Sequence, residues 1–326
     1  MRILITGIHG FVGSNLVKDL AKDNDIYGLD IICLDKDGVK QTYTWEDLER
    51  NGIPCVDVII HLAGKAHDTK NRPEAQEYFD INTGLTQKIF DYFHASTAQK
   101  FIFFSSVKAA ADFVPGDILT EEVPVNPKGP YGESKIQAEA YIKDKLGYQL
   151  NDTEFELPNG KSVYILRPCM IHGPGNKGNL NLLYSVVKKG IPWPLGAFEN
   201  KRSFTSIDNL CYVIRRLVEE VNHNIPSGVY QIGDDQALST NELIRIICST
   251  LGQKTIILKI PKGIMSFLGN IGSVLHLPLN KERLQKLTEN YVVSNAKIKS
   301  ALEIDKMPVS ATEGLTKTIR SFEKNI

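Results

Sequence analysis

Cysteine is scarce in this chain of 326 residues, and the few that occur are not placed for a disulfide framework or a metal site. There is no C-x-x-C pair and no cluster of cysteine with histidine at metal-ligand spacing. Such usage is typical of reduced thiols, so we expect no structural disulfide, no bound metal and a cytoplasmic location. The five scattered cysteines are Cys33, Cys55, Cys169, Cys211 and Cys248.

An excess of either charge is also missing, because Lys plus Arg and Asp plus Glu number 38 each. No global field therefore favours nucleic acid or an anionic membrane surface. The apolar run 264–279 is too short to cross a bilayer and is interrupted by Asn270, His276 and Pro278. The first residues lack the apolar core and cleavage site of a signal peptide. We expect no nucleic-acid partner and no membrane partner.

The first half of the chain instead contains short apolar runs that alternate with longer amphipathic stretches. RILITG precedes FVGSNLVKDLAK, and DIYGLD, VDVIIHLAG, KFIFFSS and SVYILRP follow as further strand-like runs. This alternation predicts βαβ units around a parallel sheet that is covered on both faces. We expect an α/β fold with a Rossmann-type doubly wound sheet in residues 1–167, to which about 203–233 returns, and a smaller substrate-binding α/β domain in 168–326.

Three glycines, Gly7, Gly10 and Gly13, lie between the first predicted strand and the first predicted helix. Glycine permits a tight turn and the close approach of a pyrophosphate, and the helix N-terminus offers free N–H groups. Asp30 ends the next strand, about where a carboxylate would hold an adenosine ribose, which favours NAD over NADP. Asp35 is a rival for this role.

The stretch PYGESK places Tyr131 and Lys135 four residues apart, on one face of a predicted helix. The pair is either a surface pair or a tyrosine whose pKa is lowered for acid/base work. Lowering a phenol pKa from about 10 to about 7 requires roughly 4 kcal/mol. A cation about 4 Å away, in an effective dielectric near 20, contributes on the order of 4 kcal/mol. Lys135 and a positive nicotinamide ring could therefore supply this shift together.

Taken with HLAG, FFSS, LRPCMIHGPG, KRSFTSIDNL and GVYQIGDD in the same order, these motifs resemble the extended short-chain dehydrogenase/reductase family. More narrowly, the chain resembles the NAD-dependent epimerase/dehydratase branch, which acts on nucleotide sugars. The resemblance covers most of the chain. The segment 33–51 departs from it, being shorter than the usual third βα unit, so the adenine contacts there are not carried over.

The resemblance implies NAD as cofactor and Ser106, Tyr131 and Lys135 as the catalytic residues. Ser105 is a less favoured substitute, because it lies one step nearer the buried strand. Ser106 would hydrogen-bond the reacting oxygen, Lys135 would hold the nicotinamide ribose, and Asn82 would support the backbone of the site. The implied cofactor contacts are Gly7, Gly10, Phe11, Val12, Gly13, Asp30, Leu62, Ala63, Gly64, Asn82, Tyr131, Lys135 and Pro168.

For the substrate, the resemblance implies contacts from Ser106, Asn179 and Arg202, with Arg283 as the nearest candidate for a second arginine on the diphosphate. An arginine can form two parallel hydrogen bonds to phosphate, which suits this task. The predicted helices 80–95 and 131–146 would form the four-helix interface of a homodimer. His61 and His67 flank a loop on the cofactor side and are expected to be structural.

The residues after the serine narrow the reaction within the family. Val107 and Lys108 stand where a dehydratase would carry an acid–base pair, and no cysteine lies near the serine in sequence. The leading hypothesis is an NAD-dependent 4-epimerase of a nucleotide sugar, a UDP-hexose or UDP-N-acetylhexosamine, acting through a transient 4-keto intermediate. The alternatives are a 4-ketosugar reductase or dehydrogenase that uses dissociable NAD(P)H, a dehydrogenase of a non-sugar alcohol, and a non-catalytic dinucleotide-binding protein.

Overall fold

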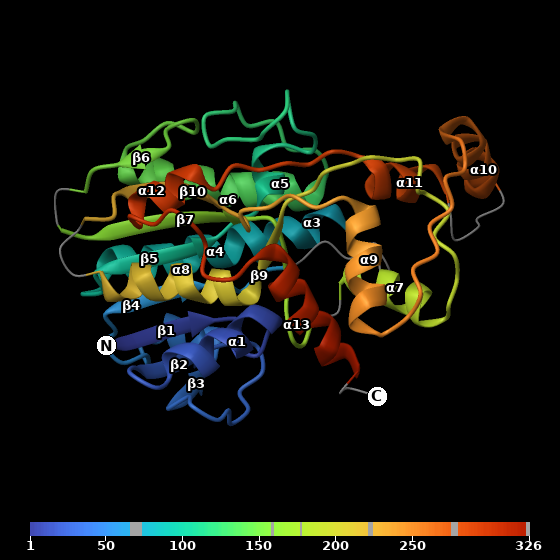
Figure 1. The fold of residues 1–326 in the computed structure, drawn as a ribbon. Coiled ribbons are helices and arrows are strands. Elements are labelled where there is room, and N and C mark those ends of the chain that lie inside the picture. Colours follow the sequence, from blue (N-terminus) through green and yellow to red (C-terminus); the bar gives the residue numbers. More distant parts are fainter. Residues whose placement is uncertain (66–73, 158–159, 177, 221–223, 275–279, 324–326) are drawn as a thin grey trace.

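A large, mostly parallel sheet forms the centre of the molecule, as the alternating pattern predicts (Figure 1). The computed structural model describes residues 1–65, 74–157, 160–176, 178–220, 224–274 and 280–323. The strand order is β3-β2-β1-β4-β5-β7-β10-β6, and only β6 runs antiparallel to its neighbour. The strands of this sheet are β1 (Arg2–Thr6), β2 (Asp25–Leu29), β3 (Gln41–Tyr43), β4 (Val58–His61), β5 (Lys100–Phe104), β6 (Glu154–Phe155), β7 (Ser162–Pro168) and β10 (Ser227–Ile232).

The sequence order of the strands reverses between β1 and β4, since β2 and β3 lie on one side and β4, β5 and β7 on the other. In open α/β sheets, ligands bind outside the carboxyl ends of the strands at such a switch point. The glycine loop follows β1 directly. The topology therefore places the predicted dinucleotide loop where a ligand site is expected.

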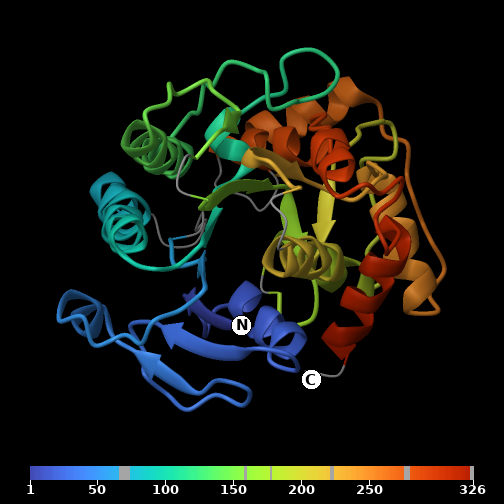
Figure 2. The ribbon, with the colours of Figure 1, turned by 90° about the vertical axis from the view of Figure 1, so that its left-hand side faces the viewer.

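Helices cover both faces of the sheet and make it a three-layer structure (Figure 2). One apolar cluster joins α1, α8 and α12 to one face, and a second joins α2, α4 and α6 to the other. Strand residues are buried on both sides, which explains why the strands read as nearly continuous apolar runs. The helices of these layers are α1 (Phe11–Leu20), α2 (Trp45–Glu49), α4 (Leu85–Ala95), α6 (Pro130–Leu146), α8 (Ile207–Glu219) and α12 (Ala296–Ala301).

The second half of the chain builds an additional apolar cluster beside the sheet, from α7, α9 and α13 with residues of α10 and α11. Figure 1 shows α10 at the outer end of this part, beyond α9 and α11. The elements outside the main sheet and its two helix layers are α3 (Ala75–Tyr78), the π-helix η1 (Phe79–Gly84), α5 (Val107–Ala110), α7 (Asn179–Lys188), α9 (Thr240–Thr250), α10 (Lys262–Val274), α11 (Lys281–Thr288), α13 (Ala311–Glu323) and the strand pair β8 (Met170–His172) and β9 (Phe204–Ser206).

The segment 33–51 is short in the structure as well, because β3 has three residues and α2 five. A capping box between Thr44 and Asp47 starts α2, which supplies partners for two otherwise unpaired backbone N–H groups. The predicted division into residues 1–167 and 168–326 stays a prediction, although β10 lies within the main sheet. Among the helices of the described residues, none is long and apolar enough to cross a membrane.

Candidate active site

The glycine loop forms a turn that larger residues could not adopt. Gly7 has a φ of +68°, and a Cβ there would lie 2.9 Å from the backbone N of Ala63. A Cβ on Gly13 would lie 2.6 Å from the carbonyl oxygen of Gly7. Helix α1 begins after Gly10 with no side-chain cap and no acidic residue in its first turn. Its free N–H groups and the positive end of its dipole can therefore receive a pyrophosphate.

Asp30 lies beside this loop at the end of β2. Its Oδ2 accepts a hydrogen bond of 3.0 Å from the N–H of His9, and its Oδ1 accepts one of 2.8 Å from Ile31. A carboxylate has about four acceptor positions, so capacity remains for the hydroxyls of a ribose. Asp35 instead lies in the loop before β3, where it lines a hollow of about 340 Å³. The geometry favours Asp30 over Asp35 as the ribose ligand.

A chain of hydrogen bonds fixes the loop that follows β4. The Oγ1 of Thr6 accepts from the N–H groups of Leu62 (3.1 Å) and Ala63 (3.0 Å) and contacts Nδ1 of His61 at 2.7 Å. Thr86 donates to the carbonyl of Asn82, so the Nε2 of His61, 3.0 Å away, must donate to Thr86. His61 is then a neutral imidazole, and its burial holds its pKa well below the ordinary value.

These contacts give His61 the structural role that was expected of it, and they order Leu62 and Ala63 beside the glycine loop. His67 lies outside the described residues.

Asn82 connects this loop to helix α6. It lies fully buried in the π-helix η1. Its Oδ1 accepts from the N–H of Lys65 (2.8 Å), and its Nδ2 donates to the carbonyl of Lys65 and to Ser134 Oγ (3.0 Å). A Cβ on Gly64 would lie 2.8 Å from this Oδ1 and 3.1 Å from Nζ of Lys135. The structure thus brings Gly64, Asn82 and Lys135 together, with Asn82 hydrogen-bonded to the backbone of Lys65.

Ser106 and Tyr131 meet at the carboxyl end of β5. Ser106 caps the short helix α5 by accepting a hydrogen bond of 3.2 Å from the N–H of Lys108, and a further hydrogen bond joins it to Tyr131. Tyr131 is half-buried, with the ring of Tyr78 edge-on at 6.3 Å. A Cβ on Gly132 would lie 2.5 Å from the carbonyl oxygen of Lys108, so this glycine is what allows α6 to approach α5.

The expected lowering of the Tyr131 pKa by Lys135 and a positive nicotinamide ring stays a prediction, and the protein's own groups act on this pKa in both directions. Desolvation raises the pKa of Tyr131 above its ordinary value, the hydrogen bond to Ser106 acts in the opposite direction, and Tyr78 adds to the rise. The ammonium of Lys135 donates 2.9 Å to the carbonyl of Phe104, and burial lowers the pKa of Lys135 to about 8. The two residues lie one turn apart, and the cation is hydrogen-bonded to a carbonyl at the end of the sheet strand β5.

The two serines have different partners in the structure. Ser105 hydrogen-bonds to the carboxylate of Glu139, which accepts two bonds from Arg167, at 2.9 Å from Nε and 2.6 Å from Nη2. Both charged side chains are at most 1% exposed. Ser105 therefore belongs to a buried ionic cluster beneath the site, while Ser106 faces Tyr131.

Glu139 and Arg167 were not identified from the sequence. The available signals were the position of Glu139, one helical turn after Lys135, and a single arginine within the apolar strand SVYILRP. Neither signal names the partner, because the two residues lie 28 positions apart in the chain.

A cysteine that is remote from Ser106 in sequence packs in the same apolar cluster as Val107, the residue after this serine. This cysteine is Cys169, and the cluster also contains Tyr291 and Val293. Its thiol is buried, and this burial raises its pKa, so it is unsuited to act as a base.

The hydroxyl of Tyr291 donates a hydrogen bond of 2.7 Å to the carbonyl of Ala111, which connects the α5 region to the second half of the chain.

The remaining cofactor-side residues lie at the same edge of the sheet. Pro168 is buried at the end of β7, opposite Ile232 of β10. Phe11 and Val12 are partly buried against the core at the start of α1, and the ring of Phe11 lies within contact distance of the position a Cβ on Gly173 would take.

The predicted substrate residues are less closely grouped. Arg202 is half-buried, with its guanidinium hydrogen-bonded to the carbonyl of Lys286 and 3.7 Å from the carboxylate of Glu289. Arg283 is exposed on α11, one turn before Lys286. Asn179 opens α7, and its side chain lies outside the described part of the structure. A diphosphate would therefore have to compete with Glu289 for Arg202.

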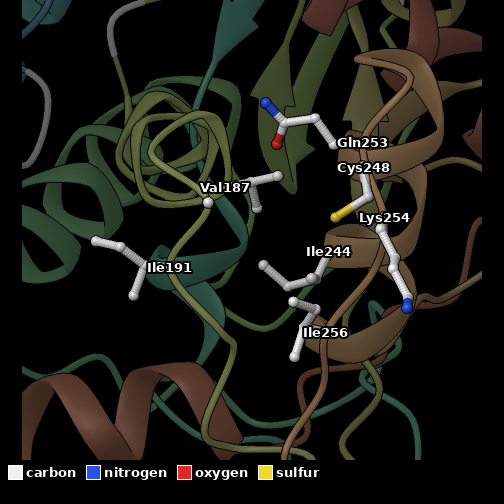
Figure 3. Close-up of a pocket in the computed structure, with 8 residues that line it drawn as sticks. Val187, Ile191, Ile244, Cys248, Gln253, Lys254 and Ile256 are labelled. Carbon is white, nitrogen blue, oxygen red and sulfur yellow. The ribbon is translucent and has the colours of Figure 1, made fainter.

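A separate cavity of about 250 Å³ lies between α7 and α9 (Figure 3). No predicted catalytic or binding residue contributes to it. Its lining is Val187, Gly190, Ile191, Ile244, Cys248, Gln253, Lys254 and Ile256. Within the described residues there is also no cluster of His, Cys, Asp and Glu that could hold a metal ion.

This chain is similar to several known proteins. Residues 3–233 match the family described as the NAD dependent epimerase/dehydratase family. The chain is 30% identical to a UDP-glucose 4-epimerase of Vibrio cholerae, with 98% of this chain and 95% of that protein covered. It is 24% identical to an N-acetyl-alpha-D-glucosaminyl-diphospho-ditrans,octacis-undecaprenol 4-epimerase of Escherichia coli O157:H7, covering 91% and 84%. Its fold resembles the NAD complex of a UDP-glucuronic acid 4-epimerase from Bacillus cereus, with a TM-score of 0.73, 19% identity and 99% of each chain covered.

Proposed function

Because this chain belongs to the NAD-dependent epimerase/dehydratase family, we propose that it is a 4-epimerase of a UDP-linked hexose or N-acetylhexosamine. It is an NAD-dependent enzyme of the extended short-chain dehydrogenase/reductase family. The observation that carries the proposal is the hydrogen-bonded pair of Ser106 and Tyr131, with Lys135 one turn away, at the sheet edge that holds the glycine loop. The relative with 30% identity is a UDP-glucose 4-epimerase, which supports the reaction and the nucleotide.

The described residues fit a dinucleotide. The uncapped start of α1 suits the pyrophosphate, the close contacts of Gly7 and Gly13 leave the backbone accessible, and Asp30 retains free acceptor positions. NAD, when bound, supplies a ring that accepts hydride from C4 of the sugar and returns it.

The protein's own part in the reaction is to move one proton and to hold the sugar. Tyr131 takes the proton of the C4 hydroxyl as the C4 hydrogen departs as hydride, and returns it when the 4-keto sugar is reduced from its other face. The raised pKa of Tyr131 means that the phenol is protonated near neutral pH, so a positive charge at the site is needed to form its base. Lys135 is the cation within one turn, and Ser106 holds the reacting oxygen by a hydrogen bond.

The residues after Ser106 argue against elimination of water. Val107 is buried in an apolar cluster, and the ammonium of Lys108 is hydrogen-bonded to the carbonyl of Asp112 at 2.8 Å. Neither side chain can serve as the carboxylic acid or carboxylate that a dehydratase requires. Simple chemistry at C4 is therefore the reaction that these two positions support.

For the nucleotide half, we propose that Arg202 and Arg283 bind the diphosphate and that Asn179 contacts the nucleotide. Arg202 and α11 already lie together, through the hydrogen bond to Lys286. A homodimer through α4 and α6 belongs to the same proposal. These helices pack against each other on one face of the sheet (Figure 2).

The test of this function is a measurement of turnover with and without net redox change. The purified protein is incubated with NAD and UDP-glucose or UDP-N-acetylglucosamine, the C4 epimer is quantified, and NADH absorbance is followed. We expect conversion to the galacto epimer with no net change in NADH. Stoichiometric formation of NADH would identify a dehydrogenase, or a 4-ketosugar reductase running in reverse, instead.

A further inference from the structure

The outer helix α10 exposes an apolar stripe where an ordinary surface helix is polar. Its side chains Ile264, Phe267, Leu268 and Ile271 follow the spacing i, i+3, i+4, i+7, which places them on one face of the helix. They are 51%, 63%, 44% and 36% exposed. This spacing normally marks the face that a helix buries against a core. Here the face is turned to solvent.

The opposite side of α10 is the side that packs against the rest of the protein. Met265 is 2% exposed, and Gly269 lies close enough to α11 that a Cβ there would be 3.2 Å from Leu284. The helix is therefore apolar on both sides, and the stripe is additional to what attaches it to the protein. An exposed apolar patch of this kind marks an interaction surface.

Basic residues surround the stripe, in a chain whose net charge is zero. Between residues 251 and 290 there are six Lys and Arg but two Asp and Glu. Lys259 and Lys262 are exposed at the N-terminal end of α10, and Lys281 follows the helix close to Gly269. A lysine at a helix N-terminus is unfavourable for the helix dipole, so these charges do not serve helix stability.

We propose that α10 binds the surface of an anionic phospholipid bilayer, with the stripe of Ile264, Phe267, Leu268 and Ile271 inserted and the flanking lysines on the head groups. An interfacial helix combines a Phe- and Leu-rich face with basic residues at its border. A symmetric pairing of two copies through this face would bring the basic borders of the two stripes together, which disfavours a second copy as the occupant. The helix lies on the membrane and does not cross it, in keeping with its 13 residues.

This proposal goes beyond the catalytic function and is tested without it. The purified full chain is sedimented with vesicles of phosphatidylcholine alone or of phosphatidylcholine and phosphatidylglycerol in equal parts. We expect the chain to bind the anionic vesicles at least about tenfold more tightly than the phosphatidylcholine vesicles, and we expect added salt to weaken this binding. The double variant Ile264→Ser/Phe267→Ser should bind about tenfold or more weakly, because the apolar insertion is lost. Phe113→Ser, which alters a side chain 49% exposed elsewhere on the protein, is the matched control and should bind as the parent does.

A second measurement does not depend on removing the stripe. In Phe267→Trp the indole emission should shift to the blue when anionic vesicles are added, and in Phe113→Trp it should not. Lys259→Gln/Lys262→Gln should reduce both the preference for anionic vesicles and its dependence on salt. The proposal is overturned if the parent chain does not sediment with anionic vesicles, or if the α10 and Phe113 variants bind alike. A change in oligomeric mass in the α10 variant, with no vesicle binding by the parent, would assign the stripe to a second copy.

Discussion

Helices α6 and α10 both contain side chains whose polarity does not match their surroundings, since α6 has charges in the interior and α10 has apolar side chains in solvent. Helix α6 buries the charges of Lys135, Glu139 and Lys143, while α10 exposes apolar side chains such as Phe267. Each buried charge of α6 has a partner inside the fold: a carbonyl for each lysine and Arg167 for the glutamate. For the stripe of α10, we propose a partner outside the protein. The buried charges of α6 are therefore explained by contacts within the fold. The exposed stripe of α10 is explained only by a binding partner outside the protein.

The largest effect that this comparison predicts is on catalysis. Tyr131→Phe should lower kcat by about 10²- to 10⁴-fold, because the proton of the C4 hydroxyl loses its acceptor. NAD binding, measured by titration, should be retained. The matched control is Tyr148→Phe, which removes a hydroxyl bonded to Glu156 beyond the end of α6 and should leave kcat unchanged. Near-parental turnover in Tyr131→Phe would remove the acid/base role from this residue.

The buried ion pair should dominate stability. Glu139→Gln leaves the charge of Arg167 uncompensated in the interior, which should lower the free energy of unfolding by about 3–5 kcal/mol. The same chemical change at an exposed pair, Asp25→Asn opposite Lys40, should cost about 0–1 kcal/mol. Both values come from denaturant titration at one pH. Equal losses in the two variants would contradict the distinction between buried and exposed charges.

A smaller effect is expected in the pH dependence of stability. Burial lowers the pKa of Lys143 to about 8, from 10.5 when exposed. Between these two values the unfolded chain binds more protons than the folded one, so the free energy of unfolding rises with pH, by at most about 1.4 kcal/mol per pH unit for each such lysine. Lys143→Met should remove this contribution from the slope between pH 8 and 10.

Lys100 provides an independent check on the same physics. Its ammonium is buried against the carbonyls of Leu217 and Val218, and burial also lowers its pKa to about 8. Lys100→Met should therefore reduce the slope by a similar amount, and the two changes should add. Unchanged slopes in both variants would show that these lysines are protonated in the folded state to a higher pH.

The sequence predicted the fold because the fold rests on local patterns, and the same patterns place the candidate site. Alternating apolar runs define the parallel strands, and three glycines between a strand and a helix define the phosphate turn. The loop after β5 is where local reasoning became ambiguous. Ser105 and Ser106 are neighbours in sequence, and only the packing of α6 shows that one contacts Glu139 and the other Tyr131.

What the sequence alone determined about this protein is therefore its order of strands and helices, its dinucleotide loop and the one-turn spacing of Tyr131 and Lys135. Tertiary structure decided the electrostatics, since a pKa depends on desolvation and on partners that are remote in the chain. Burial raises the pKa of Tyr131, and the ammonium of Lys135 donates a hydrogen bond to the carbonyl of Phe104. It also decided that the stripe of α10 faces outward. The periodicity of a helix shows that an apolar face exists, and the rest of the fold determines whether anything covers it.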